Sequence, residues 1–491
     1  MSFLDSVIVI LYITLSFGIG FFMRKYIKTM SDFVTAGQKC GVFLGVASMA
    51  GTEMGLITIM YSAQKGFTGG FAAFHIAVIA GVVTFLVGIT GFIVAPLRRE
   101  KVLTIPEYYE KRFNKKARVL GGILLTLGGL LNMGLFLKVG AMFLIGITGV
   151  SQEIVPWVMT GLLVVILVYT MSGGMMSVII TDFLQFVIMA MGLLVVIVIS
   201  LNTLSWDTLV ETVWQLKGAS GFDPFSSEGT FGLSYVLWMI LTAGLVSCAI
   251  WPTAVARALA MESEAAVKKQ YMIASVTFMI RFLIPYFLGI CAFVYFKDTG
   301  VDHSLMALPL YLKAILPMGV LGLITAGMIA AFMSTHDGYL LCWSSVITQD
   351  IIAPLVKRTL TDQERIKITR IMIVLIGVYI WYWGLIYQGT EEIWDYMAIT
   401  GAIYFTGASA VLIGGLYWTR ASSTGALWSL LAGFTALLGL GPIKTWCGLE
   451  GLTGAQIGLG AVLIATLCMI VGSMLFPDRT LPGREEERAS R

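Results

Sequence analysis

Apolar runs of about 20 residues recur along almost the whole chain, and they constrain the fold more than any other feature. A helix of about 20 apolar residues crosses the ~30 Å hydrocarbon core of a bilayer. The composition agrees, because 58% of the 491 residues are hydrophobic, 12% are charged and the mean hydropathy is +0.88. A soluble domain carries about 25% charged residues. The sequence therefore predicts an all-α integral membrane protein embedded in a lipid bilayer.

We count about thirteen apolar runs, and we expect each to be a transmembrane helix. Their cores are Ser6–Met23, Gly41–Tyr61, Phe74–Val94, Val119–Ile147, Ile154–Tyr169, Val178–Leu201, Leu233–Val255, Tyr271–Val294, Val320–Trp343, Ile371–Tyr387, Met397–Trp418, Leu427–Leu440 and Ile457–Met474. Basic residues gather in alternate connections, most densely in Arg98–Arg118, whereas the acidic group Glu391, Glu392 and Asp395 lies in a connection of the other set. The positive-inside rule then predicts a cell-membrane protein with its N-terminus outside and its C-terminus in the cytoplasm.

The loops exclude several classes of membrane protein. None is long enough to form a catalytic domain, and the chain has no GxxxxGK[ST] loop that would power ATP-driven pumping. The six cysteines are scattered singly, so they form neither a disulfide framework nor a metal cluster. We expect no enzymatic activity, no nucleic-acid partner and a monomeric state. Polar residues inside the spans are costly unless they are used, which favours secondary transport of a small solute.

Two spans carry the signs of a helix broken near the membrane midplane. The segment Ala47–Thr58 holds Gly51, Glu53 and Gly55, and the segment Leu241–Arg257 holds Gly244 and Pro252. Transporters use such breaks to bind ions and substrates with exposed carbonyls and helix ends. The breaks occupy matching places if spans two to six and seven to eleven form two five-helix halves. Because five is odd, the halves would enter the membrane from opposite sides as an inverted repeat.

This symmetry divides the single membrane domain into five parts. We predict a leading helix and loop (1–39), a first inverted repeat (40–202), a second inverted repeat (231–420), two trailing helices (421–476) and a cytoplasmic tail (477–491).

Five motifs, in order along the chain, resemble the sodium:solute symporter family, which includes the sodium/proline, sodium/pantothenate and sodium/glucose cotransporters. The motifs are DFVTAGQ (Asp32–Gln38), LTIPEYYEKRFNKKAR (Leu103–Arg118), SGGMMSVIITDFLQ (Ser172–Gln185), AAFMST with SSVITQDI in the ninth span, and GGLYWTRASSTGA (Gly414–Ala426). The resemblance implies sodium-coupled symport by alternating access. It also implies a five-plus-five inverted-repeat core of the leucine-transporter type, with one leading and two trailing helices.

The resemblance further implies a sodium site between the first broken helix and the ninth span. It would consist of carbonyls of Gly51, Met54 and Ala331 and hydroxyls of Ser334 and Thr335. The last three residues lie at i, i+3 and i+4, on one face of a helix, and neutral oxygens suit a hard monovalent cation. The alternative is that both hydroxyls bond back to carbonyls of their own helix.

Two further residues are candidates for a second sodium site or for a sodium exit path. Thr58 matches the position of a hydroxyl that some family members use for another ion, although its expected partner position is Gly55. Asp182 resembles a family aspartate near the inner end of the sixth span. If Asp182 or Glu53 titrated during transport, the protein would instead be a proton-coupled carrier. A solute-sensing, transporter-like receptor is a further alternative.

A pocket is expected beside the sodium site, between the two broken helices and the fourth and eleventh spans. Its predicted lining is Glu53, Lys138, Gly244, Cys248, Pro252 and Tyr404. Lys138 lies in mid-span, so it needs a ligand or a partner. It would either capture a carboxylate or pair with Glu53. The first reading favours a carboxylate-bearing solute such as an amino acid, a monocarboxylate or a vitamin-like acid.

Three other polar residues in the spans are assigned to packing. Arg281 is expected to form a structural pair, because the resemblance places it on a scaffolding helix. His336 and Asp337 turn away from the face of Ala331 and Thr335 at ~100° per residue, so they are expected to hold the helix in the bundle.

Overall fold

Helices make up nearly all of the regular structure in the computed structural model, which describes residues 2–23, 40–172, 175–226, 229–356, 358–387 and 392–478. In the first half the helices are α1 (Phe3–Met23), α3 (Val42–Glu53), α4 (Leu56–Gly69), α5 (Phe74–Thr90), α6 (Val94–Arg99), α7 (Ile105–Arg112), α8 (Lys115–Met133), α9 (Phe136–Thr148), α10 (Val155–Ser172), α11 (Met175–Thr203) and α12 (Trp206–Lys217). In the second half they are α13 (Leu233–Met239), α14 (Pro252–Leu259), α15 (Glu264–Tyr295), α16 (Ala307–Ile315), α17 (Val320–Val346), α18 (Ala353–Leu355), α19 (Asp362–Ile386), α20 (Ile393–Tyr417), α21 (Ser423–Ala432), α22 (Gly441–Trp446) and α23 (Gly454–Leu475).

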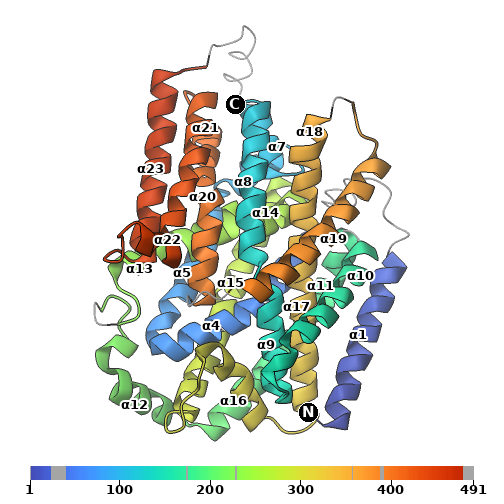
Figure 1. The fold of residues 1–491 in the computed structure, drawn as a ribbon, viewed down its shortest axis with the longest axis vertical. Helices are drawn as coiled ribbons and strands as arrows, with labels where there is room; N and C mark the ends of the chain where they lie inside the picture. Colours follow the sequence, from blue (N-terminus) through green and yellow to red (C-terminus); the bar gives the residue numbers. More distant parts are fainter. Residues whose placement is uncertain are drawn as a thin grey trace.

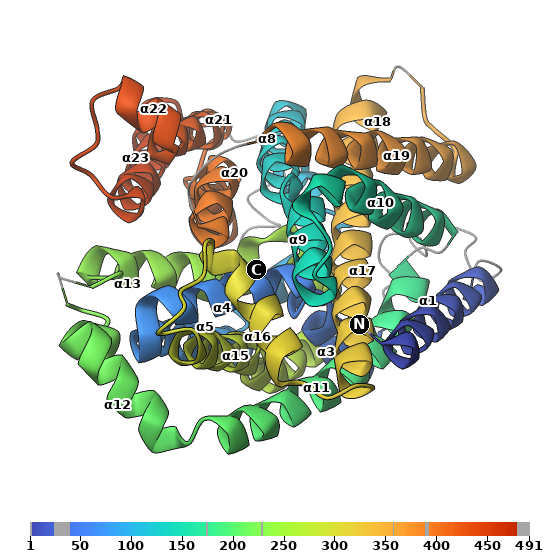
Figure 2. The same cartoon turned by 60° about the horizontal axis from the view of Figure 1, so that its bottom comes forward.

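Several long helices, among them α8, α17, α20 and α23, run roughly along the long axis of the molecule, while α10 and α19 are inclined to it (Figure 1). The leading helix α1 and the trailing helices α21 to α23 lie on opposite sides of this bundle (Figures 1 and 2). The short helices α7 and α18 lie at one end of the bundle, and α12 and α16 lie at the other (Figure 1). Each of the thirteen predicted apolar runs falls largely on helical residues.

In the described part of the chain, nine helical segments are long and apolar enough by themselves to cross a membrane. Shorter apolar helices, among them Phe3–Leu15, Val42–Glu53 and Ser423–Gly439, account for predicted runs that are not among the nine. The chain is thus a multi-pass membrane protein, and thirteen crossings stays a prediction.

The first broken helix is present where the sequence placed it. Helix α3 ends at Glu53, Met54 leaves the helical conformation at φ −96° and ψ 54°, and Gly55 is extended at φ −80° and ψ 168° before α4 begins. A helix that stops in this way leaves its last carbonyls without the amide partners that an uninterrupted helix supplies. The Thr58 hydroxyl satisfies one of them, because it donates to the Glu53 carbonyl at 3.0 Å.

The second broken helix has a less regular form. Helix α13 passes into a π-helix, Ile240–Ile250, which ends at Trp251 in extended backbone at φ −69° and ψ 127°. Pro252 then starts α14, since proline disfavours a helical residue before it and fits the first helical position. The i→i+5 hydrogen bonding of a π-helix widens each turn, so the faces of this segment differ from those of an α-helix.

A short backbone strap joins the two broken helices at one end. Cys40 forms an isolated parallel bridge with Met261: its amide donates to the Ala260 carbonyl at 3.0 Å, and its carbonyl accepts from the Glu262 amide at 3.2 Å. The Arg98 side chain adds a bond to the Met261 carbonyl at 2.6 Å. The start of α3 and the end of α14 are therefore held together.

Candidate functional site

A cavity lies between the two breaks, at the centre of the bundle. The space between its lining atoms, with the open solvent at its mouth included, measures about 680 Å³. Its lining comes from α3, α4, the second broken helix, α8, α9, α15, α17 and α20. The lining residues are Thr52, Glu53, Ile57, Thr58, Tyr61, Asn132, Phe136, Thr242, Val246, Ser247, Trp251, Arg281, Thr335, Tyr339, Trp394, Met397, Ala398, Gly401 and Phe405.

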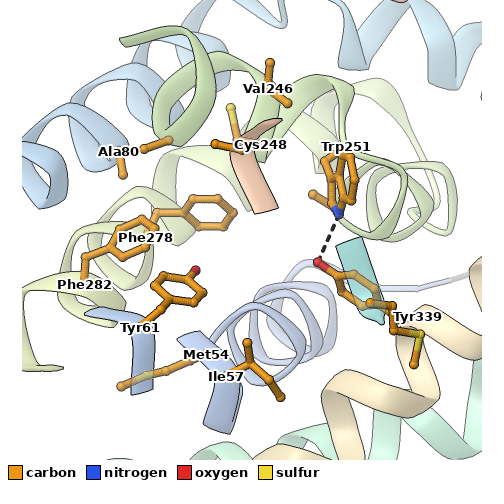
Figure 3. Packing of buried hydrophobic residues seen from close by; sticks show 14 of the residues in the cluster. Met54, Ile57, Tyr61, Ala80, Val246, Cys248, Trp251, Phe278, Phe282 and Tyr339 are labelled. Atoms are coloured by element: carbon orange, nitrogen blue, oxygen red, sulfur yellow. Dashed lines mark hydrogen bonds between the residues drawn. The ribbon is translucent and has the colours of Figure 1, made fainter. Parts of the chain in front are cut away.

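Aromatic rings form much of the cavity wall. Tyr61 lies on one side of the space, and Trp251 and Tyr339 lie on the opposite side (Figure 3). The indole N–H of Trp251 donates to the Tyr339 hydroxyl at 3.0 Å, so these two rings fix one another across two helices. Trp394 packs on Tyr61 with ring centroids 5.0 Å apart. The wall is therefore largely apolar and suits an apolar portion of a solute.

An ion pair between Glu53 and Arg281 lies in this wall. Arg281 Nη1 donates to Glu53 Oε2 at 2.6 Å, and Arg281 Nη2 donates to the Ser247 hydroxyl at 2.5 Å. The other carboxylate oxygen of Glu53 accepts from the Thr253 hydroxyl at 2.9 Å. The pair connects the first break, the second broken helix and α15 around one cavity.

The Arg281 guanidinium is fixed in position by the rings next to it on α15. Its central carbon lies 4.0 Å from the Phe278 ring centroid and 4.5 Å from that of Phe282, which are cation–π distances. Arg281 is 4% exposed, and its buried Nε has no hydrogen-bond partner among the described residues. Asn132, also in the lining, is 3% exposed; its amide nitrogen donates to the Met397 carbonyl at 2.8 Å, while its Oδ1 has no partner within the same described ranges.

The structure places Lys138 outside the cavity lining and away from a pair with Glu53. Lys138 Nζ donates to the Tyr387 carbonyl at 2.9 Å, at the end of α19, and the residue is not part of the cavity lining. The partner of Glu53 is Arg281, which the sequence had assigned to structural pairing alone. Arg281 does form a pair, but it does so in the wall of the cavity. An arginine in mid-span was the available signal, and only the fold identifies its surroundings.

Of the six residues predicted to contact the solute, Glu53 lines the cavity and the others lie elsewhere. Gly244 faces α5, because a Cβ there would lie 3.0 Å from Val83. The Cys248 carbonyl accepts from the Tyr271 hydroxyl at 2.7 Å. Pro252 borders a smaller pocket, and the Tyr404 hydroxyl lies 3.1 Å from that of Tyr109.

The π-helix explains why Gly244 and Cys248 lie outside the cavity lining. Counting back from Pro252 in α-helical turns selects Cys248 and Gly244, whereas the wider π turns present Thr242, Val246 and Ser247 to the cavity.

The first break also packs closely against α17, beside the cavity. A Cβ built on Gly55 would lie 1.7 Å from Thr335 Oγ1 and 3.4 Å from the Ala331 carbonyl oxygen. The Thr335 hydroxyl donates to the Ala331 carbonyl at 3.0 Å and lies 3.4 Å from the Thr52 carbonyl. Back-bonding within α17, the alternative considered from the sequence, thus occurs together with approach to the break.

Two of the predicted sodium ligands, Ala331 and Thr335, lie beside the first break. Gly51 and Met54 lie at the end of α3, and Ala331, Ser334 and Thr335 lie on α17; the structure buries all of them. The donor set consists of neutral oxygens, which is the chemistry a sodium ion requires. The Thr52 carbonyl, which the sequence analysis did not include, belongs to the same junction. Thr58 lines the cavity nearby, while the Asp182 side chain lies outside the described residues.

His336 and Asp337 make the contacts of packing residues. His336 Nδ1 lies 2.7 Å from the Phe332 carbonyl oxygen, and its ring packs on Phe332 and Phe136. Asp337 accepts a hydrogen bond from the Thr170 hydroxyl on α10.

A second charged group lies beyond the cavity, at the end of the bundle that carries α12 and α16. Lys65 of α4 is buried, and its Nζ lies 2.5 Å from Glu392 Oε2 and 2.8 Å from Asp395 Oδ2 at the start of α20. The Tyr235 hydroxyl donates to Asp395 Oδ1 at 3.4 Å. This group connects α4, the second part of the first broken helix, to α20, next to the cavity residues Tyr61 and Trp394.

Comparison with known proteins agrees with this architecture. A model of the Sodium:solute symporter family matches residues 33–433, which is most of the chain. The Sodium/pantothenate symporter of Haemophilus influenzae is 24% identical over 484 residues, covering 95% of each protein. The High-affinity proline transporter PutP of Bacillus subtilis is 23% identical over 441 residues, covering 86% of this chain and 88% of its own.

Among solved structures, a Na⁺-coupled sialic acid symporter aligns over 98% of this chain and 100% of its own, with a TM-score of 0.82 at 18% identity. That likeness confirms the predicted fold class, and the family match confirms the predicted resemblance and its coupling ion. The chain belongs to the sodium:solute symporter family, and it is a multi-pass membrane transporter that couples the movement of a small solute to sodium.

Proposed function

We propose that this symporter carries a small carboxylate-bearing solute through the central cavity and is not an enzyme. The buried Arg281 in the cavity wall supports the proposal above all other observations. A guanidinium is the side chain best suited to a carboxylate, because it presents a planar set of N–H donors. Arg281 thereby takes the role that the sequence analysis gave to Lys138.

The sodium ion would bind at the junction of the first break with α17. Its ligands would be carbonyls of Gly51, Met54 and Ala331 and the hydroxyls of Ser334 and Thr335, with Thr58 and Asp182 as candidates for a second ion or an exit path. Thr335 supports a link between ion and solute, because it lies at the junction and also lines the cavity. An ion that fixes this junction raises the affinity for the solute, and the coupling must be reciprocal.

We further propose that the protein is a monomer in the cell membrane, with its N-terminus outside and its C-terminus in the cytoplasm. The basic residues of α7 lie at the end of the bundle opposite α12, α16 and the first residues of α1, which supports this orientation (Figure 1). The two breaks support division of the core into inverted repeats at 40–202 and 231–420, with trailing helices at 421–476.

Uptake by the purified full chain in lipid vesicles tests the function. Small carboxylates are offered with sodium or potassium outside at one fixed pH. We expect uptake only with sodium, and we expect Ser334→Ala with Thr335→Ala to raise the half-activating sodium concentration about tenfold or more. Thr325→Ala is the matched control, because Thr325 is buried on the same helix and donates to the Leu321 carbonyl at 2.7 Å.

Other outcomes identify the competing functions. Uptake that ignores sodium and follows a pH gradient would indicate a proton-coupled carrier. Solute binding without uptake would indicate a solute-sensing receptor. Normal sodium activation in the double variant would remove the proposed ion site.

A further inference from the structure

We infer that the cavity is built for a zwitterion, a solute with one carboxylate and one ammonium group on an apolar body, such as an apolar amino acid. This inference rests on the proposed function and narrows its solute class. The observation that carries it is the Glu53–Arg281 pair in the cavity wall, together with a donor on Arg281 and an acceptor on Asn132 that have no hydrogen-bond partner among the described residues.

The ion pair itself discriminates between classes of solute. Breaking a buried pair is costly when one charge is left without a partner. A solute with a carboxylate alone would satisfy Arg281 and strand Glu53, and a solute with an ammonium alone would do the reverse. A zwitterion replaces the internal pair with two new ones, so that the charges stay balanced.

Both protein charges are held in place by groups other than each other. The Glu53 carboxylate keeps its bond from the Thr253 hydroxyl at 2.9 Å. Arg281 keeps the Ser247 hydroxyl at 2.5 Å and lies between the rings of Phe278 and Phe282. A solute that enters between the charges therefore meets binding groups that are already oriented, which lowers the cost of binding.

Two polar atoms in the wall lack partners and match the two ends of such a solute. Buried polar atoms are nearly always hydrogen-bonded, so each exception needs an explanation. Arg281 Nε is a donor without an acceptor, which a second carboxylate oxygen would satisfy. Asn132 Oδ1 is an acceptor without a donor, which an ammonium N–H would satisfy. Both residues are more than nine-tenths buried, and both line the cavity.

The rest of the lining indicates an apolar body and disfavours a polyol. Tyr61, Phe136, Trp251, Tyr339, Trp394 and Phe405 contribute six aromatic rings. The Thr242 hydroxyl already donates to the Trp238 carbonyl at 2.8 Å, and the Thr58 hydroxyl to the Glu53 carbonyl at 3.0 Å. A sugar needs many polar partners around its whole surface, and this wall supplies them at one side.

Matched probes test the inference on the purified full chain. Leucine, 4-methylpentanoate and 3-methylbutylamine share one branched apolar body and carry both charges, the carboxylate alone or the ammonium alone. Phenylalanine, 3-phenylpropionate and 2-phenylethylamine repeat the comparison, and glucose represents a neutral polyol. Affinity is read from the thermal shift at saturating sodium. We expect the better-fitting amino acid to bind about tenfold or more tightly than either of its one-charge analogues.

Two variants locate the discrimination in the named residues. Glu53→Gln leaves Arg281 able to take a carboxylate, so the preference for the amino acid over its carboxylate analogue should fall by about tenfold. Asn132→Leu keeps the ion pair intact and should reduce the same preference by about threefold or more. Thr406→Val is the control, since Thr406 is buried on α20 outside the cavity lining and its hydroxyl bonds within its own helix at 2.7 Å, so the preference should be unchanged.

The outcomes separate this inference from the proposed function. If carboxylates without an ammonium bind as tightly as the amino acids, the inference fails and the carboxylate symporter stands. If glucose alone binds, or if no member of either series does, both the zwitterion and the carboxylate are wrong. If amino acids bind equally well in sodium and potassium, the inference stands and the sodium site fails. Unchanged preferences in both Glu53→Gln and Asn132→Leu would also overturn the inference.

Discussion

Replacing Gly55 with alanine is the sharpest single test of the junction between the first break and α17. The backbone does not resist this change, because Gly55 is extended at φ −80° and ψ 168°, a conformation that any residue adopts. The obstacle is space: the new Cβ would lie 1.7 Å from Thr335 Oγ1 and 2.9 Å from Thr335 Cβ. Rotating the Thr335 side chain would move the hydroxyl but leave the second contact.

The distances fix the expected magnitude. Ordinary contact begins near 3.4 Å, so the break and α17 must separate by about 1.7 Å if the Thr335 hydroxyl stays in place, or by about 0.5 Å if the side chain rotates away. Overpacking of this kind costs about 1–3 kcal/mol. If that cost falls on the sodium-bound form alone, sodium binds about 5- to 150-fold more weakly.

Sodium titration of thermal stability and of uptake measures this effect. Gly41→Ala is a closely matched control, because Gly41 precedes α3 as Gly55 precedes α4, with φ −76° and ψ 163°, and its Cβ would meet nothing within 4 Å. We expect the Gly41 variant to keep the sodium affinity of the natural chain. A Gly55 variant whose sodium affinity stays within twofold of the Gly41 variant would refute a tight junction at Thr335.

Two further predictions concern the contacts around the cavity. Lys65→Met leaves two carboxylates without their cation and should lower the unfolding free energy by about 1–3 kcal/mol, less than for a fully buried pair because both carboxylates are partly exposed. Lys297→Met, at an exposed lysine, should leave the unfolding free energy unchanged. Equal thermal midpoints for the two variants would contradict the ion pairing. Trp251→Phe and Tyr339→Phe remove the same hydrogen bond, and each should lower the unfolding free energy by about 1 kcal/mol. The double variant should lose little more than either single variant. Fully additive losses in a double-mutant cycle would show that the two side chains do not interact.

The sequence predicted the fold through features that act locally. Runs of apolar residues form helices in a membrane wherever they occur, since the backbone must satisfy its own hydrogen bonds there. The breaks were also local, because Gly55 and Pro252 mark positions where a helix readily stops. The location of the cavity between the two breaks followed from these features, and Glu53 followed from its place in the first break.

The partners of the buried charges could not be read from the sequence. Lys138 and Arg281 are both basic residues in mid-span, and nothing near them in the chain distinguishes the one that bonds to a helix end from the one that faces the cavity. The residues that the second broken helix presents to the cavity could not be read from the sequence for another reason. Its backbone is π-helical from Ile240 to Ile250, so α-helical spacing points to Gly244 and Cys248, whereas Thr242 and Ser247 line the cavity.

The backbone strap at Cys40 couples the two broken helices mechanically. Because Cys40 is bonded to Ala260 and Glu262, the start of α3 and the end of α14 share one anchor and cannot slide past each other without losing two backbone hydrogen bonds. Their remaining freedom lies at the two breaks, where Gly55 and Trp251 have extended backbone. A change of angle at one break is thus passed through the anchor to the other. The residues proposed to bind the ion and those proposed to bind the solute therefore lie on mechanically coupled helices.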